Sequence, residues 1–169
     1  MIRFKEYLEK HFETTITEDD IRKAIKVNNE ARLALRKLYG VMKHDPAPIT
    51  GYDLFKVLYG STFKLDRSLI AGEVNALVEK IEKEYKEGKM QPKKPRILVT
   101  GCPLGGATEK VIRAIEDNGG IVVTYENCTG AKAIDKMVDE DDPDVYGALA
   151  RRYLDIGCSV MTPNPNRME

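Results

Sequence analysis

The chain has 169 residues, of which 42% are hydrophobic and 32% are charged, so it is long and apolar enough to bury a core and too apolar for a disordered segment. Lys and Arg together number 27, and Asp and Glu together also number 27, so the formal net charge is zero. A zero balance gives no electrostatic reason to expect a nucleic acid or an anionic membrane as a partner. It also sets no charge barrier against a homo- or hetero-dimer.

The apolar pattern contains no membrane or secretion signal. No stretch approaches the ~20 consecutive apolar residues of a membrane helix. The segment Met1 to Phe12 carries charges throughout and lacks the apolar centre of a signal peptide. Three cysteines are too few, and odd in number, for a secreted disulfide scaffold. We therefore expect a cytoplasmic protein.

Residues 1–90 are predicted to form a helical lobe. Apolar residues recur there at helical spacing, in four runs separated by residues that begin or end helices. Thr and Ser cap helix starts, Pro interrupts a helix, and Gly ends one. The predicted starts and stops are Thr17, Asp45 to Pro48, Thr50, Ser68 and Gly88.

The rhythm changes after a basic, proline-containing linker at Lys86 to Pro95, and residues 96–169 are predicted to form a partial Rossmann-like α/β lobe. Ile97 to Thr100 and Ile121 to Tyr125 are short apolar runs that are typical of buried parallel strands. A helix starting at Ala107 or Thr108 joins them, which predicts a right-handed βαβ unit. A polar segment from Glu126 to Asp144 follows, and then a helix from Pro143 to about Leu154.

Two strands are fewer than a stable sheet usually has, because sheets commonly have ~4–6 strands. We therefore expect that the chain is a fragment of a longer protein, or that a partner supplies further strands. The alternative is a natural small protein with a minimal sheet.

The three cysteines occupy similar places in this pattern. Cys102 follows the first predicted strand, Cys128 follows the second, and Cys158 lies in a loop after the last predicted helix. Loops beyond the carboxyl ends of parallel strands line one crevice, so we expect Cys102 and Cys128 to face the same crevice and Cys158 to be able to join them.

Thiolates ligate iron–sulfur clusters and zinc, and three ligands would leave one metal position open. The absence of a C-x-x-C pair disfavours a structural zinc site and a simple ferredoxin. The alternative is that the three cysteines are small buried hydrophobic residues.

The segment Gly101 to Thr108 resembles a phosphate-binding loop, but Ala107 stands where that loop requires lysine, and Lys110 comes too late. Nucleotide hydrolysis is therefore not expected. The turn can still present backbone N–H groups to an anion or to a cluster sulfide. This leaves open a non-catalytic module that binds an anion or a CoA-like ligand, or a module that interacts with another protein.

The remaining polar residues give no catalytic assignment. His11 and His44 are interpreted as surface or capping residues because neither has a triad partner. The acidic run from Asp139 to Asp142 suits a solvated loop before a helix better than a cation site. Ser159 and Thr162 are either hydrogen-bond donors in the loop of Cys158 or turn residues around Pro163.

Several motifs in this order resemble the 2-hydroxyacyl-CoA dehydratase D-component family, which includes benzoyl-CoA reductase-type subunits and double-cubane cluster proteins. They are Arg96-Ile-Leu-Val-Thr-Gly-Cys-Pro, Asn118-Gly-Gly-Ile-Val-Val, Glu126-Asn-Cys-Thr-Gly, Ala148-Leu-Ala-Arg-Arg-Tyr-Leu and Cys158-Ser-Val-Met-Thr-Pro-Asn. The helical stretch from about Thr17 to Tyr85 also resembles the family's segment before the first of these motifs.

The resemblance implies a [4Fe–4S]-type cluster ligated by Cys102, Cys128 and Cys158. It also implies an ATP-dependent activator protein as electron donor, and a radical dehydration or reduction of an acyl-CoA or another small molecule. Two departures matter: Val160 stands where the family often has a second cysteine, and the family's second cysteine-bearing lobe is absent. We therefore expect this chain alone to be inactive, and to lack the cluster after aerobic preparation.

Overall fold

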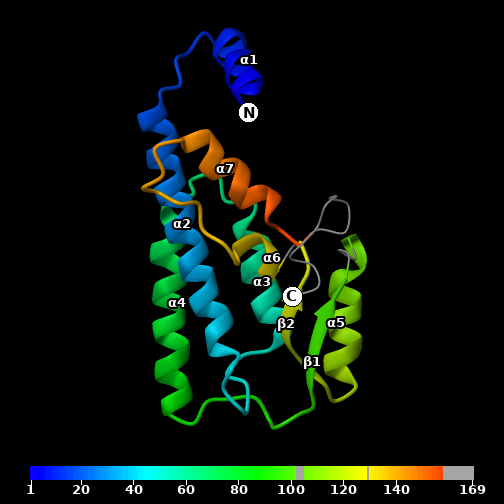
Figure 1. Ribbon diagram of the computed structural model, residues 1–169. Coiled ribbons are helices and arrows are strands. Elements are labelled where there is room, and N and C mark those ends of the chain that lie inside the picture. The colour runs from blue at the N-terminus through cyan, green and yellow to red at the C-terminus, as the bar shows by residue number, and fades with distance from the viewer. Residues whose placement is uncertain (102–104, 129, 158–169) are drawn as a thin grey trace. The chain divides into compact units, whose positions relative to one another are not determined.

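The computed structural model describes residues 1–101, 105–128 and 130–157. Its elements in chain order are α1 (Ile2–Phe12), α2 (Glu18–Val41), α3 (Gly51–Ser61), α4 (Ser68–Lys86), β1 (Arg96–Thr100), the 3-10 turn η1 (Gly105–Ala107), α5 (Thr108–Asp117), β2 (Ile121–Glu126), α6 (Ala131–Ile134) and α7 (Val145–Leu154) (Figure 1). Helices precede a parallel βαβ unit, so the predicted α/β class is confirmed. Within the described residues, no helix is long and apolar enough to cross a membrane.

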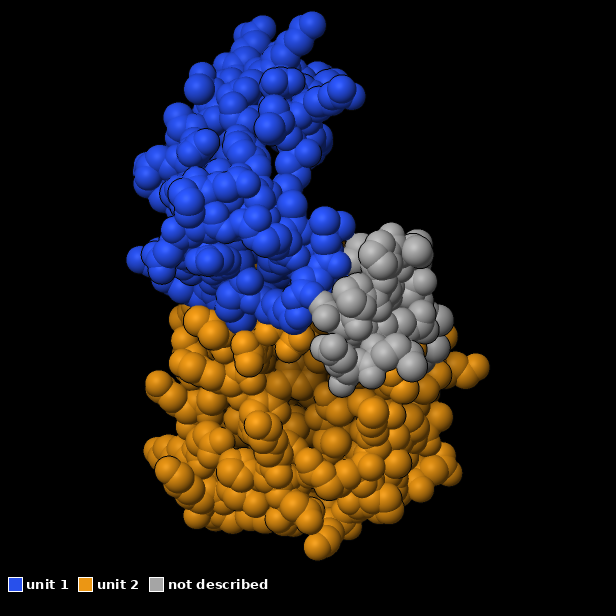
Figure 2. Space-filling view, in the orientation of Figure 1, with its two compact units in different colours: residues 1–30, 136–169 blue, residues 31–135 orange. Residues whose placement is uncertain are grey.

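The chain divides into two compact units, which Figure 2 colours separately. Residues 1–30 and 136–169 form unit 1, and residues 31–135 form unit 2. The units are defined by contacts along the whole chain, whereas the predicted lobes 1–90 and 96–169 follow the change of sequence pattern. That division into lobes stays a prediction.

Thr17 and Thr50 cap helices where the sequence places them, whereas Ser68 is the first residue of α4 and its side chain caps nothing. The hydroxyl oxygen of Thr17 accepts a hydrogen bond of 3.2 Å from the N–H of Asp20, and the Asp20 carboxylate accepts one of 3.0 Å from the N–H of Thr17. At α3, the hydroxyl oxygen of Thr50 accepts a hydrogen bond of 3.0 Å from the N–H of Asp53. These reciprocal contacts satisfy backbone donors that the first turn of a helix leaves unpaired.

Gly88 ends α4 as predicted. Its φ is +85°, a region that favours glycine, and its N–H donates to the carbonyl oxygen of Tyr85 at 3.0 Å. The next N–H, of Lys89, reaches back to the carbonyl oxygen of Glu84, also at 3.0 Å. This pair of bonds is a Schellman motif, which pairs the last carbonyl groups of the helix.

Unit 2 is built around β2. The two strands pair in parallel, and a register shift after Ile97 leaves Val123 without a partner on β1. Helices α3 and α5 both pack against β2. One continuous core joins these elements to α2 and α4, and its fully buried members include Leu38, Leu54, Ile70, Ile112, Val122 and Tyr125.

The prediction that Ile97 to Thr100 is a buried strand is wrong. Residues 96, 98 and 100 are exposed, and Leu98 is 54% exposed, whereas β2 is largely buried. An all-apolar run indicates burial on both faces only when both faces are covered. Here Ile97 and Val99 face the core, and the opposite face of β1 is open.

Glu116 of α5 joins three parts of unit 2. Its carboxylate accepts hydrogen bonds from the N–H of Gly51 at 2.7 Å, of Tyr52 at 3.3 Å and of Val122 at 3.3 Å. The first two donors lie in the first turn of α3, where a negative charge is favourable. A side chain distant in the sequence therefore fixes the start of α3 against the start of β2.

Unit 1 has its own small core, made by Ile25, Val138, Val145 and Ala148. The buried side chain of Asn29 ties this core to the segment before α7. Its Nδ2 donates to the carbonyl oxygen of Val138 at 2.8 Å, and its Oδ1 accepts from the N–H of Val138 at 3.0 Å. Helix α7 begins at Val145, close to the predicted start, with Asp144 as its cap. Helix α6 was missed, because four residues carry too little pattern.

Candidate functional site

Cys128 is the one predicted ligand among the residues that the structure describes. It lies two residues after the end of β2, and its side chain is an exposed, free thiol. Cys102 and Cys158 lie outside the described residues. The meeting of the three thiols at one crevice therefore stays a prediction.

The turn that carries Cys128 is held in place at Asn127 before the cysteine and at Gly130 after it. The N–H of Gly130 donates to the carbonyl oxygen of Asn127 at 3.1 Å, and Asn127 itself is buried and hydrogen-bonded. A side chain at position 130 would collide with the backbone of Tyr125 and with the hydroxyl of Tyr39. Glycine at this position lets the chain approach β2 closely, so the thiol of Cys128 projects from a turn with fixed ends.

Tyr39 and Tyr125 support this turn from within unit 2. The hydroxyl of Tyr39 donates to the carbonyl oxygen of Tyr125 at 3.2 Å, and the hydroxyl of Tyr125 donates to the carbonyl oxygen of Gly51 at 2.7 Å. Burial raises the pKa of both phenols, so both stay protonated donors at neutral pH. Helices α2 and α3 are in this way linked to the carboxyl end of β2.

The last residues of the two strands are joined beside the turn. The hydroxyl of Thr100 donates to the carboxylate of Glu126, and the Nζ of Lys132 lies 3.0 Å from Glu126 Oε1. The hydrogen bond from Thr100, helped by Lys132 and by the N–H of Gly101, lowers the pKa of Glu126 below its ordinary value. The pairing keeps the chain segments that lead to Cys102 and Cys128 at the same edge of the sheet.

The turn after β1 is described only in part. Gly101 has a φ of +104°, which favours glycine, and α5 begins at Thr108 after η1. Residues 102–104 lie outside the described residues, so the predicted presentation of backbone N–H groups to an anion there stays untested.

Both histidines contact neighbouring side chains, and their interpretation as surface or capping residues stays a prediction. His44 Nε2 lies 3.0 Å from Glu82 Oε1, and its ring stacks on Tyr85 with ring centres 4.4 Å apart. His11 stacks on Tyr7 at 5.7 Å. Neither contact resembles a nucleophile with its base.

The acidic run also has structural partners. Glu140 accepts a hydrogen bond of 2.7 Å from Asn29, and Asp142 forms an ion pair with Arg151. In the part of the chain that the structure describes, no three His, Cys, Asp or Glu side chains lie close enough together to hold a metal ion.

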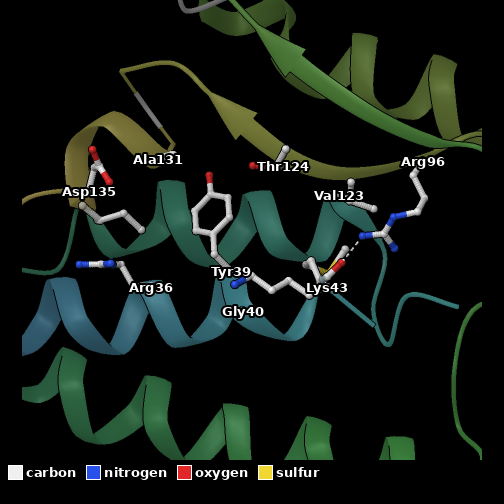
Figure 3. Close-up of a pocket in the computed structure, with 11 residues that line it drawn as sticks. Arg36, Tyr39, Gly40, Lys43, Arg96, Val123, Thr124, Ala131 and Asp135 are labelled. Atoms are coloured by element: carbon white, nitrogen blue, oxygen red, sulfur yellow. Dashed lines mark hydrogen bonds between the residues drawn. The ribbon is translucent and has the colours of Figure 1, made fainter. Parts of the chain in front are cut away.

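Sequence reasoning missed a hollow of about 410 Å³ within unit 2. Figure 3 shows it between the end of α2 on one side and β2 and α6 on the other. The basic side chains of Arg36, Lys43 and Arg96 contribute to its lining. No sequence pattern indicates it, because Arg36 lies in α2, Lys43 lies two residues beyond the end of α2 and Arg96 lies in β1.

Comparison with known proteins decides the family. The family model for the 2-hydroxyglutaryl-CoA dehydratase D-component matches residues 1–169. The chain belongs to this dehydratase D-component family. The predicted resemblance is thereby confirmed over the whole chain.

A curated relative agrees with the family match. The chain is 46% identical over 169 residues to YjiM, a protein of Escherichia coli (strain K12) that is provisionally named a dehydratase subunit. The match covers 100% of this chain and 44% of that relative, so the chain spans less than half of the relative's length.

Proposed function

We propose that this chain is part of a dehydratase subunit that works with a [4Fe–4S]-type cluster and acts on an acyl-CoA. The cluster receives single electrons from an ATP-dependent activator protein. Membership of the D-component family over residues 1–169 supports the dehydratase assignment. In this proposal Cys102, Cys128 and Cys158 are the cluster ligands.

The exposed thiol of Cys128 is the single observation that carries the ligand assignment. A cluster ligand must be a deprotonated sulfur that iron can reach, and Cys128 is free, exposed and outside any helix or strand. Its turn is fixed at Asn127 and Gly130, so little conformational freedom would be lost on ligation. The chemistry of the donor and its presentation thus fit an iron–sulfur cluster.

The protein's own residues prepare the site in two ways. The hydrogen bond between Thr100 and Glu126 keeps the two strand ends together, which supports the approach of the loops of Cys102 and Cys128. Lys132 pairs with Glu126, so this carboxylate adds no uncompensated negative charge beside thiolate ligands. When bound, the cluster would supply low-potential one-electron chemistry.

The proposal extends to organisation and compartment. We infer a helical lobe over residues 1–90 and a partial Rossmann-like lobe over residues 96–169 that presents the cysteines. We also infer a reducing cytoplasm, because exposed thiols persist there. A homo- or hetero-dimer would bring in further strands at the edge of β1 that is unpaired among the described strands.

The test is the iron content after anaerobic reconstitution with iron and sulfide. Cys128→Ser removes the ligand and preserves the size of the side chain, so we expect it to lose the reconstituted iron. Met90→Ser is the control, because Met90 is 38% exposed and lies in the linker between α4 and β1, outside both strands. Equal iron in Cys128→Ser and in the unchanged chain would refute the assignment of Cys128 as a ligand.

A further inference from the structure

We propose that the hollow between α2, β2 and α6 in unit 2 binds the diphosphate group of a small organic ligand. Tyr39 lines the hollow and also supports the turn that carries Cys128, but Cys128 itself does not line the hollow, and the proposal does not depend on the cluster. It rests on the charge, spacing and availability of the side chains around the hollow (Figure 3).

The lining is basic. Arg36, Lys43 and Arg96 face one carboxylate, that of Asp135, among the described residues that line the hollow. Three cations against one anion leave a formal charge of +2, in a chain whose overall formal charge is zero. Concentrated positive charge in a concave site attracts anions more strongly than the same charge on a flat surface.

Two of these basic side chains are available to bind a ligand. Within the described residues, neither the side chain of Arg36 nor that of Lys43 has a hydrogen-bond or ion-pair partner, and both are exposed. Arg96 is different, because its guanidinium donates to the carbonyl oxygens of Met42 and His44, the latter at 2.8 Å. Arg96 therefore covers carbonyl groups just beyond the end of α2, which would otherwise repel an anion there.

A second hollow, in unit 1, is lined by basic side chains that already have partners within the protein. It is lined by Lys136, Arg151 and Arg152 among others. Lys136 pairs with Asp155, Arg151 pairs with Asp142, and Arg152 donates to the carbonyl oxygen of Lys136 at 3.0 Å. The cations of that hollow are held by the protein itself, whereas Arg36 and Lys43 are available to a ligand.

The spacing favours two linked phosphates over one. Arg36 lies within α2 and Lys43 lies two residues beyond its end, and Figure 3 shows their side chains at separate positions along the hollow, so a single phosphate suits one of them better than both. Between them lies Gly40, where the absence of a side chain leaves open space. Guanidinium groups bind phosphate oxygens through paired hydrogen bonds, which suits Arg36 to one end of a diphosphate.

The rest of the lining suits the organic part of such a ligand. Val123, Ile134 and Met42 provide apolar surface, and Thr124 provides a hydroxyl. Tyr39 also lines the hollow, but its hydroxyl is already bonded to β2, and burial keeps it neutral. A volume of about 410 Å³ lies in the range of about 300–1,000 Å³ that is usual for small-molecule sites.

The experiment is calorimetric titration of the chain with inorganic pyrophosphate, with ADP and with orthophosphate. We expect pyrophosphate and ADP to bind and orthophosphate to bind at least about tenfold more weakly. Tighter binding of ADP than of pyrophosphate would indicate that the apolar lining holds the organic part. Arg36→Ala and Lys43→Ala should each weaken pyrophosphate binding by about tenfold, and the double variant by about 100-fold.

The matched control is the double variant Lys80→Ala/Lys110→Ala. It also removes two positive charges, but from exposed positions of unit 2 that do not line the hollow. We expect its affinity for pyrophosphate to stay within about twofold of the unchanged chain. An equal loss in both double variants would mean that net charge alone attracts the anion, and would overturn the site.

Two further outcomes would also overturn the proposal. One is the absence of binding of both pyrophosphate and ADP at up to about 5 mM. The other is unchanged binding in Arg36→Ala/Lys43→Ala. A variant with all three cysteines changed to serine separates this proposal from the cluster proposal, because it should keep pyrophosphate affinity and lose iron.

Discussion

Gly130 ends the turn that carries Cys128, and it lies so close to β2 that no side chain fits at position 130. An added Cβ would lie 2.7 Å from the hydroxyl oxygen of Tyr39 and closer still to the carbonyl oxygen of Tyr125. Both groups belong to the core of unit 2, where neighbours yield little. The identity of one residue therefore controls the path of the chain through the turn.

We predict that Gly130→Ala lowers the free energy of unfolding by about 1–3 kcal/mol, because the backbone must move away from β2. Urea unfolding measures the change. Gly72→Ala in α4 is the control, since an added Cβ there meets nothing within 4 Å. It should raise the free energy of unfolding by about 0.5–1 kcal/mol. A Gly130→Ala variant as stable as the unchanged chain would show that the close approach does not exist.

Asp142 gives a pH-dependent prediction in unit 1. Its pKa lies below the ordinary value of 3.8, first because its carboxylate accepts from the N–H of Asp144 and also because it pairs with Arg151. A lowered pKa in the folded state means that the carboxylate stabilises the fold above about pH 3.8, and that this contribution is lost as the pH falls through the folded pKa.

We therefore expect Asp142→Asn to be less stable than the unchanged chain near pH 7, with the difference shrinking below about pH 3.8. Urea unfolding across that range measures it. Asp141→Asn changes the adjacent carboxylate, which is exposed, and should show little difference at any pH. A gap for Asp142→Asn that stays constant with pH would contradict the role of its charge.

At the scale of elements, Glu116 is the contact on which α3, α5 and β2 depend together. Replacing it by alanine leaves three backbone N–H groups without their charged acceptor. One hydrogen bond to a charged group contributes about 1.5–3 kcal/mol. Two of the three bonds here are long, at 3.3 Å, so we expect Glu116→Ala to lower the free energy of unfolding by about 1.5–3 kcal/mol in total.

The neighbouring carboxylate supplies the control for this prediction. Asp117→Asn alters an exposed side chain at the end of α5 and should change the free energy of unfolding by less than about 0.5 kcal/mol. Unfolding in urea, followed by circular dichroism, compares the two variants. If Glu116→Ala unfolds at the same urea concentration as Asp117→Asn, Glu116 does not join these elements.

The sequence predicted what is local in these elements. Thr17, Thr50 and Gly88 act at the helix ends where their chemistry places them, because caps involve residues three or four apart. It could not predict Glu116, which bonds residues 65 and 64 positions away. It also misjudged β1, because a run of apolar residues does not reveal whether a second layer covers the sheet.

On the scale of the whole molecule, the core of unit 2 provides the largest expected effect of a substitution. Leu54 is 0% exposed, so Leu54→Ala should lower the free energy of unfolding by about 2–5 kcal/mol. Leu65 is 99% exposed, and the same truncation there should change it by less than about 0.5 kcal/mol. Similar values for the two variants in urea unfolding would contradict the assignment of this core.

The sequence also predicted the family, because the motifs that indicate it are short stretches of the chain. The hollow of unit 2 could not be predicted in the same way. Arg36 and Arg96 are 60 residues apart in the sequence, and only folding brings α2, β1 and β2 to its walls. Whole-molecule features of this kind depend on which elements pack together, and single patterns do not encode that.

The most direct test of the central claim is electron paramagnetic resonance of the chain after anaerobic reconstitution and reduction, with iron measured on the same sample. The account predicts a reducible [4Fe–4S]-type signal in proportion to bound iron, and its loss in Cys128→Ser but not in Met90→Ser. A signal and iron content unchanged by Cys128→Ser, or iron bound without any reducible signal, would contradict it.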